Sequence, residues 1–318
     1  MDLDSLIADK LSGVYNLSSR IHPLQSFPAR TYLKRDDELS FGISGNKLRK
    51  IASLLPFWKE QGKVVYAIGG ASSNHIVACL QVMIEHKIDY RLILLKSAAA
   101  LSLQGNPAYI SLLSDPRRIL WLEREQWPDV EKFAEDEARS RDENFLITKE
   151  GGAQREAFPG AMTLGQDILR NQAEHGFSFH NIFIDAGTGY SALALKYYLD
   201  SVGFPGMLHV VKLAPFDFEK MEKALWDYYG QPKNPVNFKI WDPISAKSFG
   251  SVNRSCFDEV KKMARDEGVL LDPIYMAKLS MTARYLIETH CHRDSKNLLI
   301  HSGGGLSTHG FWDKILRS

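Results

Sequence analysis

Residues 64–80 read VVYAIGGASSNHIVACL, and this stretch decides the fold class. Its first part, 64–68, is a short apolar run with β-branched residues that two glycines end, which is typical of a buried strand. An apolar pattern with helical spacing follows over about 74–86. A buried strand that leads through a glycine turn into a helix is the repeating unit of a parallel α/β sheet.

The same alternation of strand and helix runs through the rest of the chain. Further strands are predicted at 30–35, 90–95, 119–122, 145–148, 181–185, 208–213, 238–241 and 297–300. Helices are predicted from 47 onward and at 107–114, 128–141, 160–175, 192–201, 218–229, 256–267 and 276–289. Such alternation indicates parallel sheets with right-handed crossovers. The sequence therefore predicts an α/β fold.

The composition indicates a globular protein with an ordinary surface. Of its 318 residues, 44% are hydrophobic and 24% are charged, and a chain of this length has room for two domains with separate cores. The net charge of +1 gives no reason to expect a nucleic-acid or membrane partner. Because the chain shows neither a signal peptide nor a stretch of about 18 apolar residues, a cytoplasmic protein is expected.

The cysteines and histidines do not support a disulfide framework or a metal site. Cys79, Cys256 and Cys291 lack the paired spacing that such structures need. The run His290-Cys291-His292 contains three potential ligands, but residues two apart on a helix point in different directions. We therefore expect no metal.

Residues 44–50 read SGNKLRK and place a lysine at the start of a helix. Apolar residues follow at helical spacing, so Lys47 lies in the first turn, where the helix carries partial positive charge. With Arg49 and Lys50 nearby, an ammonium group there should lose its proton more easily than a free lysine. A neutral amine is what a lysine needs to form a Schiff base. The alternative is an ordinary solvated lysine on a basic helix start.

A second glycine turn, GTGYS at 187–191, follows the strand predicted at 181–185. Glycines and hydroxyl groups at a helix start bind phosphate through backbone N–H groups. With Ala192 the stretch also matches the dinucleotide pattern Gly-x-Gly-x-x-Ala. That pattern needs an acidic residue after the next strand, which instead ends in Lys212-Leu213-Ala214. A single phosphate group therefore fits the turn better than a dinucleotide.

Polar side chains also follow three other apolar runs, where open parallel sheets bind their ligands. They are Ser73, Asn74, His75, Ser302 and Tyr275. Ser73 or Asn74 can simply cap a helix, and Tyr275 can be a core residue, but the helix start at Ser73 also offers free amides that suit a carboxylate. Together with Lys47 and the phosphate turn, these groups indicate pyridoxal 5'-phosphate, which needs an amine for its aldehyde, a phosphate site and a group facing its ring nitrogen.

Five short motifs occur in an order that resembles a known enzyme family. They are GNKLRK at 45–50, SNH at 73–75, EGG at 150–152, EGVLLDPIY at 267–275 and HSGG at 301–304. Jointly they resemble the 1-aminocyclopropane-1-carboxylate deaminase and D-cysteine desulfhydrase family, which has the tryptophan-synthase-β-like fold (fold type II) of pyridoxal-phosphate enzymes.

The resemblance implies an architecture. It consists of two open, twisted, mainly parallel sheets flanked by helices. Residues 1–45 and 156–318 would form a large cofactor-binding domain and residues 46–155 a small domain, with the cofactor in the cleft between them. The resemblance also implies a homodimer that acts on a small amino acid.

The resemblance also implies roles for individual residues. Lys47 would bind the cofactor as a Schiff base and later move the α-proton of the substrate. Ser73 would hold the substrate carboxylate, with Asn74 and His75 beside it, and Asn74 would also hydrogen-bond the ring hydroxyl. Lys47, Ser73 and Tyr275 would be the catalytic residues, with the α-hydrogen facing Lys47 or Tyr275.

Two further sites would contact the cofactor. Ser302 would face the pyridine nitrogen, where a neutral hydroxyl leaves the ring largely unprotonated and favours elimination. The phosphate group would be bound, largely through backbone donors, by Gly187, Thr188, Gly189, Tyr190 and Ser191.

Three positions depart from the family pattern. Met276 stands where deaminases have a glutamate, Phe249 where both activities use a second tyrosine, and Ser72 where a glutamine precedes the Ser-Asn pair. Met276 cannot pair with a pyridinium, and Phe249 lacks a possible acid–base group. The sequence therefore favours a D-cysteine desulfhydrase-like elimination that gives an α-keto acid and ammonia. The alternatives are ring-opening deamination of 1-aminocyclopropane-1-carboxylate to 2-oxobutanoate and ammonia, and a cofactor-binding relative that has lost its activity.

Overall fold

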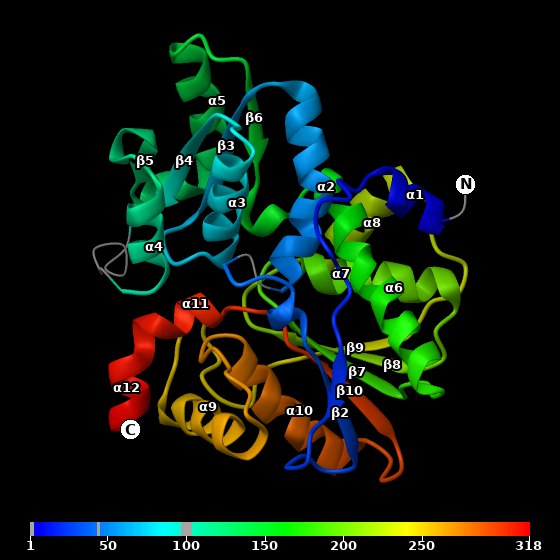
Figure 1. Ribbon diagram of the computed structural model, residues 1–318. Helices are drawn as coiled ribbons and strands as arrows, with labels where there is room; N and C mark the ends of the chain where they lie inside the picture. Colours follow the sequence, from blue (N-terminus) through cyan, green and yellow to red (C-terminus); the bar gives the residue numbers. More distant parts are fainter. Residues whose placement is uncertain (1–2, 43–44, 97–103) are drawn as a thin grey trace.

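The computed structural model describes residues 3–42, 45–96 and 104–318, and within them the chain forms two sheets flanked by helices (Figure 1). Ser44 of the SGNKLRK stretch lies outside the described residues. The larger sheet has six strands in the order β1-β2-β10-β7-β8-β9, and the smaller has four in the order β5-β4-β3-β6. The predicted α/β class with two mainly parallel sheets is confirmed.

The large sheet is built from both ends of the chain. Its strands are β1 (Ile21–Pro23), β2 (Arg30–Lys34), β10 (Lys296–Ile300), β7 (Asn181–Ala186), β8 (Met207–Lys212) and β9 (Asn237–Trp241). All neighbours run parallel except β1 and β2. Successive side chains face opposite sides, so Ile182 and Ile184 enter one core and Phe183 enters another. Helices α6, α7 and α8 cover the first side, and α9 and α10 cover the second (Figure 1).

The small sheet is wholly parallel and comes from the middle of the chain. Its strands are β5 (Ile119–Leu122), β4 (Tyr90–Leu95), β3 (Val64–Gly70) and β6 (Phe145–Thr148). Strand β3 is buried on both sides, since Val65 and Ala67 face helices α2 and α3, whereas Tyr66 and Ile68 face α5. The continuous apolar run that marked this strand in the sequence reflects burial on both faces.

Helices α2 to α10 agree with the predicted alternation, whereas α1, α11 and α12 were not predicted. They are α1 (Leu3–Asp9), α2 (Asn46–Gln61), α3 (Asn74–Glu85), α4 (Asn106–Leu113), α5 (Val130–Ser140), α6 (Phe158–His175), α7 (Tyr190–Val202), α8 (Phe218–Tyr229), α9 (Arg254–Glu267), α10 (Met276–His290), α11 (Gly305–Thr308) and α12 (Trp312–Arg317). Short 3-10 turns are η1 (Asp36–Glu38), η3 (Pro116–Arg118), η4 (Arg124–Asp129), η5 (Glu150–Gly152), η6 (Arg155–Ala157) and η7 (His309–Phe311).

Two details of the predicted pattern are wrong. The helix predicted at 128–141 is divided into η4 and α5, because Pro128 cannot continue an α-helical hydrogen-bond ladder. The apolar run before Tyr275 is not a strand. It is a buried loop in which Val269 and Leu271 pack into the core beside α9 and α10.

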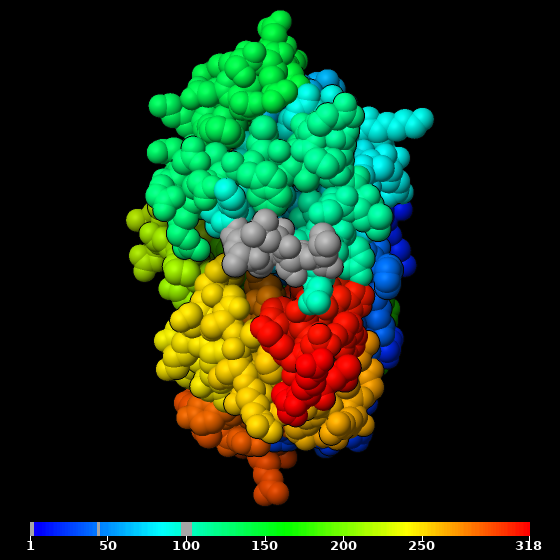
Figure 2. Space-filling view, turned by 90° about the vertical axis from the view of Figure 1, so that its left-hand side faces the viewer, coloured from blue at the N-terminus to red at the C-terminus, as the bar shows by residue number. Residues whose placement is uncertain are grey.

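Helix α2 connects the two sheets. It packs against α6 on the large-sheet side and against α3 on the small-sheet side, and one hydrophobic core continues through all three helices. At the opposite edge, the C-terminal helices α11 and α12, red in Figure 2, lie directly below the blue-green segment that contains α4. The domain boundaries at 45/46 and 155/156 stay a prediction.

The crossing of α2 and α6 gives a testable prediction about Gly160. A Cβ atom on Gly160 would lie 2.0 Å from the Arg49 carbonyl oxygen, so the two helix backbones touch there. Gly→Ala normally stabilises a helix interior, but Gly160→Ala is expected to lower the free energy of unfolding by about 3 kcal/mol, since the helices must separate. Urea unfolding measures this change. Gly305→Ala, in a helix position with open space around it, is the control and should change stability by less than about 0.5 kcal/mol.

Candidate active site

The turn before Lys47 is fastened to the end of β10. Gly45 has a φ of +72°, and a Cβ atom there would lie 1.8 Å from the Ser302 carbonyl oxygen, so this approach requires glycine. The backbone N–H of Asn46 donates to the same oxygen at 3.3 Å. The start of α2 therefore lies at the carboxyl end of the large sheet, beside Ser302.

Lys47 is the second residue of α2, as the sequence predicted, and its amine lies among polar groups. Its Nζ donates to Asn46 Oδ1, and the carboxyl groups of Asp185 and Asp272 are near enough to influence its titration. Burial lowers the pKa of the Lys47 amine, and the two carboxyl groups oppose this shift. The direction agrees with the expectation, but its main cause is burial rather than the neighbouring cations. A lowered pKa favours the neutral, nucleophilic amine.

The two cations after Lys47 have contacts of their own. The Arg49 guanidinium is fully buried and pairs with Asp36 at 2.6 Å, so it does not face the Lys47 amine. Lys50 donates to the Gly151 carbonyl oxygen at 2.7 Å and lies over the Tyr190 ring. Burial and the Lys47 charge hold the pKa of Lys50 well below its usual value. Lys50 thereby ties α2 to the turn that follows β6.

The predicted phosphate turn connects β7 to the start of α7. Gly189 adopts a left-handed conformation just before the helix, and the first N–H groups of any helix have no partner within it. The hydroxyl of Ser191 is buried and has no hydrogen-bond partner among the residues that the structure describes. A Cβ on Gly151 would lie 2.7 Å from Thr188 Cγ2, so the turn after β6 closes directly over this helix start. These unpartnered donors are those that a phosphate group needs.

The polar turn after β3 forms the start of α3. Ser73 is the helix cap, because its Oγ accepts hydrogen bonds from the backbone N–H groups of His75 and Ile76 at 3.2 and 3.4 Å. The capping alternative therefore applies to Ser73, and its hydroxyl proton stays available to a ligand.

Asn106, at the start of α4, fixes the orientation of the Asn74 side chain. The Asn106 amide nitrogen donates to the Ser72 carbonyl oxygen and to Asn74 Oδ1, both at 2.8 Å. Since a carbonyl oxygen can only accept, the Asn106 amide must present its NH₂ group, and Asn74 must present its oxygen to it. The Asn74 NH₂ group is then left facing Gly304, where a built Cβ would lie 3.4 Å from it. Asn74 can therefore donate to a group in the cleft.

His75 lies behind the site rather than in it. Its ring is 1% exposed and lies between Cys79 and Gly152, with Sγ of Cys79 3.4 Å from Nε2. Burial, with the charges of Lys50 and Lys47, holds the pKa of His75 well below its usual value, so the ring is neutral. The predicted contact of His75 with a substrate carboxylate does not follow from this placement, because a neutral, enclosed ring packed on sulfur is a core group.

Asp272 organises the approach to Tyr275. Its carboxylate accepts hydrogen bonds from the backbone N–H groups of Ile274, Tyr275 and Met276 at 2.7–3.1 Å and so holds the turn that leads into α10. The Tyr275 ring lies against the phosphate turn, since its Cε1 would be 3.3 Å from a Cβ on Gly187. Burial raises the pKa of the Tyr275 hydroxyl, with further contributions from Asp272 and Asp185, which keeps it protonated. Tyr275 is thus placed beside the same turn as the predicted phosphate site.

The three departures from the family pattern occupy different places. Met276 is fully buried and its Sδ accepts from the Ser302 backbone N–H at 3.4 Å, so position 276 does lie beside Ser302. Ser72 lines a cavity at the mouth of the site. Phe249 lies in the turn between β9 and α9 with 58% of its surface exposed.

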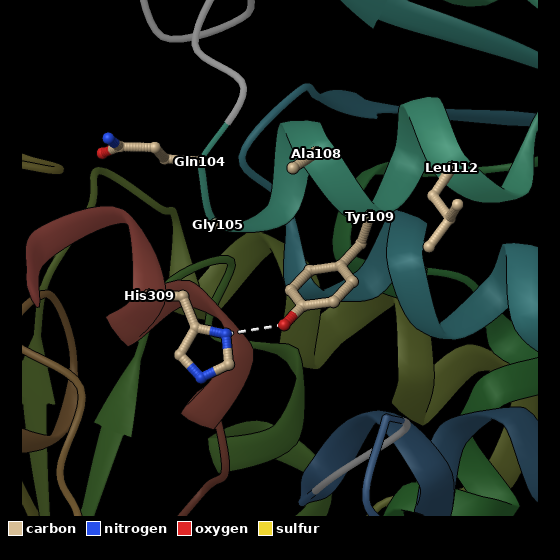
Figure 3. A pocket seen from close by; sticks show the side chains of 6 residues that line it. All are labelled: Gln104, Gly105, Ala108, Tyr109, Leu112 and His309. Carbon is tan, nitrogen blue, oxygen red and sulfur yellow. Dashed lines mark hydrogen bonds between the residues drawn. The ribbon is translucent and has the colours of Figure 1, made fainter.

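Among the described residues, hollows of two sizes lie between the small-sheet and large-sheet parts. The smaller, about 100 Å³, adjoins Asn74 and Tyr275 and is lined by residues from both parts, among them Ser72, Asn106, Ile274 and Ser307. The larger, about 340 Å³, is an open groove in which Tyr109 on α4 hydrogen-bonds His309 Nδ1 at 2.6 Å (Figure 3). Neither hollow is lined by a predicted site residue, but the smaller one includes Ser72 and Ile274, the chain neighbours of Ser73 and Tyr275, so it is the better entrance for a substrate.

Three residues at the site escaped the sequence analysis. Asp185, Asp272 and Asn106 all lie within the cluster described above. Asp185 could have been found from the sequence, because a carboxylate near the end of an otherwise apolar, buried strand is costly and therefore indicates a function. Asn106 could not have been found, because its contact with Asn74 joins residues 32 positions apart.

Comparison with known proteins identifies proteins that are similar to this chain over most of its length. No family model matches the chain. It is 26% identical to a provisionally named 1-aminocyclopropane-1-carboxylate deaminase of Pyrococcus furiosus, over 92% of each chain. It is 25% identical to a D-cysteine desulfhydrase of Yersinia enterocolitica, over 86% of each chain.

A solved structure of similar shape is the crystal structure of a 1-aminocyclopropane-1-carboxylate deaminase homologue. It matches with a TM-score of 0.83 and 23% identity, and the match covers 99% of this chain and 98% of that one. The resemblance predicted from the five motifs is confirmed over most of the chain, and so is the fold. In the described part of the chain, every helix is too short or too polar to cross a bilayer.

Proposed function

We propose that the protein is a pyridoxal-phosphate-dependent lyase that releases an α-keto acid and ammonia from a small amino acid. The observation that carries the proposal is the Lys47 amine, which has a lowered pKa and lies where the turns after β3, β7 and β10 converge. A neutral lysine beside a phosphate-binding helix start is a combination that an aldehyde-and-phosphate cofactor requires.

The residues present fit this cofactor at three points. Ser191 Oγ and the free N–H groups of α7 offer donors to a phosphate group, and Lys47 offers an amine to the aldehyde. The Asn74 NH₂ group, oriented by Asn106, offers a donor to the ring hydroxyl. The buried Asp185 oxygen, for which the described residues provide no partner, shows that the cavity also has an acidic side.

The bound cofactor would supply an electron sink for negative charge at the α-carbon of the substrate. The chain's own groups would do the rest. Ser73 binds the substrate carboxylate through its hydroxyl proton, since the N–H groups of His75 and Ile76 are already bonded to its oxygen, and Lys47 moves the proton at the α-carbon. The protonated Tyr275 hydroxyl, beside the phosphate turn, is placed to donate a proton to the leaving group.

D-Cysteine, or another β-substituted D-amino acid, is the substrate class that the residues favour. The cyclopropane acid has no α-hydrogen for Lys47 to move, and ring opening needs another acid–base route. The two positions that supply it in deaminases hold Met276 and Phe249 here, and neither side chain transfers protons. Ring-opening deamination and loss of activity are the alternative functions.

Parallel assays test this choice. Pyruvate release from D-cysteine is expected to be faster than 2-oxobutanoate release from the cyclopropane acid, and the reverse order would favour the deaminase. A cofactor spectrum that responds to D-cysteine without keto-acid release would favour an inactive relative. A panel of both enantiomers of small amino acids identifies the leaving group.

Ser73→Ala gives a second prediction. Loss of one charge-assisted hydrogen bond to the substrate carboxylate costs about 1.5–3 kcal/mol, so kcat/KM should fall roughly ten- to a hundredfold. Ser73→Thr keeps the hydroxyl and should retain most of the wild-type kcat/KM. Asp217→Ala, which removes the cap of α8 instead, controls for the loss of a helix cap. Equal losses in the Ser73 and Asp217 variants would show that only helix capping is involved.

The cytoplasmic location and the homodimer also stay proposals. The homodimer rests on the sequence resemblance, and the cytoplasmic location rests on the expectation drawn from the sequence pattern. Light scattering of the purified protein tests the dimer, and fractionation of cells that produce it tests the location.

A further inference from the structure

Asp185 is the buried charge at the site that the proposed roles leave unused. Its side chain is 5% exposed at the end of β7, and in the described part of the chain its Oδ1 has no hydrogen-bond partner. A buried carboxyl oxygen without a partner is costly, and native structures keep such groups mainly where they have a task.

Strand pairing brings Asp185 next to Ser302. Leu299 of β10 lies opposite Phe183 of β7, so two residues further on Asp185 is level with His301, the neighbour of Ser302. Burial raises the pKa of the Asp185 carboxyl, and a hydrogen bond from the Ser302 hydroxyl opposes that shift. The other acceptor near this hydroxyl, Sδ of Met276 at 3.9 Å, is a weak one.

Four other titratable side chains interact with Asp185: Lys47, His301, Asp272 and Tyr275. The Lys47 amine and the His301 ring lower the pKa of Asp185. Burial, and to a smaller extent the Asp185 charge, raise the pKa of the Asp272 carboxyl to about 6. Burial and the Asp185 charge also raise the pKa of the Tyr275 hydroxyl. Asp272 accepts three backbone N–H groups, whereas Asp185 Oδ1 accepts from no described residue. Asp185 is therefore the carboxyl with capacity left for a ligand.

We propose that Asp185 is a positioning residue that acts through Ser302 to keep the ring nitrogen of the bound cofactor protonated. The inference rests on the proposed function, in which Ser302 faces that nitrogen. It replaces the expectation that a neutral hydroxyl leaves the ring unprotonated. A serine that is hydrogen-bonded to a carboxyl group can pass on a proton from that group, which a serine alone cannot do.

The proton balance of this arrangement is closed. With Asp185 protonated, its carboxyl would donate to Ser302 Oγ, and the serine hydroxyl would donate to the ring nitrogen of a bound cofactor. After both protons had moved one step, Ser302 Oγ would accept from the protonated nitrogen, and the serine hydroxyl would donate to the Asp185 carboxylate. No atom is lost and no external proton is needed. A protonated ring stabilises more negative charge at the α-carbon and therefore eases removal of the α-proton by Lys47.

Nitrogen NMR of protein loaded with ¹⁵N-labelled pyridoxal phosphate tests the inference directly. The wild-type signal is expected at the position of a pyridinium. In Asp185→Asn, which keeps the size of the side chain but cannot release the proton, the signal should move to the position of an unprotonated pyridine. Ser302→Ala, which interrupts the relay, should give the same shift, and Ser302→Thr should restore the wild-type signal. Asp272 is a nearby carboxyl group that already accepts three backbone N–H groups, so Asp272→Asn should leave the wild-type signal unchanged.

The outcomes separate this inference from the proposed function. Borohydride reduction that attaches cofactor to Lys47 in each variant shows that the cofactor site has survived the substitution. A label on Lys47 with an unprotonated wild-type ring, or a ring that stays protonated in Asp185→Asn, would overturn the role of Asp185 alone. Absence of any label in the wild type would overturn the proposed function as well.

Discussion

Replacing Lys47 by alanine is expected to abolish turnover, with a loss of about 10⁴-fold or more. Proton transfer by a positioned side chain contributes up to about 10⁴-fold, and removal of a covalently acting group often costs more. The variant should also lose the absorbance band near the visible edge that a lysine-bound cofactor gives, because the aldehyde then has no amine partner. Absorbance spectra and keto-acid assays on the same preparation measure both effects.

Lys278 provides the matched control for this experiment. It is also a buried lysine whose pKa burial lowers, but its Nζ donates to the Ser248 carbonyl oxygen at 3.4 Å. Lys278→Met should keep the cofactor band and the turnover. If Lys47→Ala retains the band, or if both variants lose it equally, Lys47 is not the attachment point.

The second large effect concerns stability, and it comes from a buried ion network that holds α2 in place. Arg49 contacts Asp36 at 2.6 Å and Asp167 at 2.9 Å, and the Lys34 amine also pairs with Asp167. All four side chains are nearly or fully buried. Removing one partner of such a network leaves uncompensated charge inside the protein, which typically costs 3–5 kcal/mol.

Arg49→Met is therefore expected to lower the free energy of unfolding by about 4 kcal/mol. Urea unfolding followed by circular dichroism measures it. Arg20→Met is the control, because Arg20 pairs with Glu38 at the surface and should contribute less than about 1 kcal/mol. Similar losses in the two variants would show that the buried network adds no more than a surface ion pair.

The same network predicts a pH dependence through Asp167. Burial raises the pKa of this carboxyl, but Arg49 and Lys34 outweigh burial and bring it to about 2. Because the folded-state pKa lies below the unfolded one, the stabilisation is present above about pH 4 and is lost as pH falls through 2, in total roughly 2 kcal/mol. In Asp167→Asn this part of the acid-side slope should be absent, and an unchanged slope would contradict the assignment.

The sequence was sufficient for the features that depend on local pattern. The start of α2 at Lys47 followed from a glycine turn and apolar spacing, and the phosphate turn followed from glycines and hydroxyls at a strand end. The alternation of strand and helix gave the fold class because each strand and most helices carry their own periodicity.

Features that depend on contacts between distant segments were out of reach. The burial of His75 depends on Gly152, 77 positions later, which packs against its ring. The closeness of Asp185 to Ser302 depends on β10 pairing with β7, and the Arg49–Asp167 pair depends on α6 crossing α2. Short elements such as α11 and α12 were missed because four to six residues are too few to show a period.

The central claim is that Lys47 holds the cofactor, and peptide mapping after borohydride reduction tests it most directly. Two lysines with lowered pKa values, Lys47 and Lys50, lie one helical turn apart, so the measurement must distinguish them. Lys50 is engaged with the Gly151 carbonyl oxygen, whereas Lys47 faces the carboxyl groups of the site. We expect the reduced cofactor to be found on Lys47 in a stoichiometric amount. A label on Lys50, Lys278 or any other lysine, or no label, would contradict the assignment of Lys47.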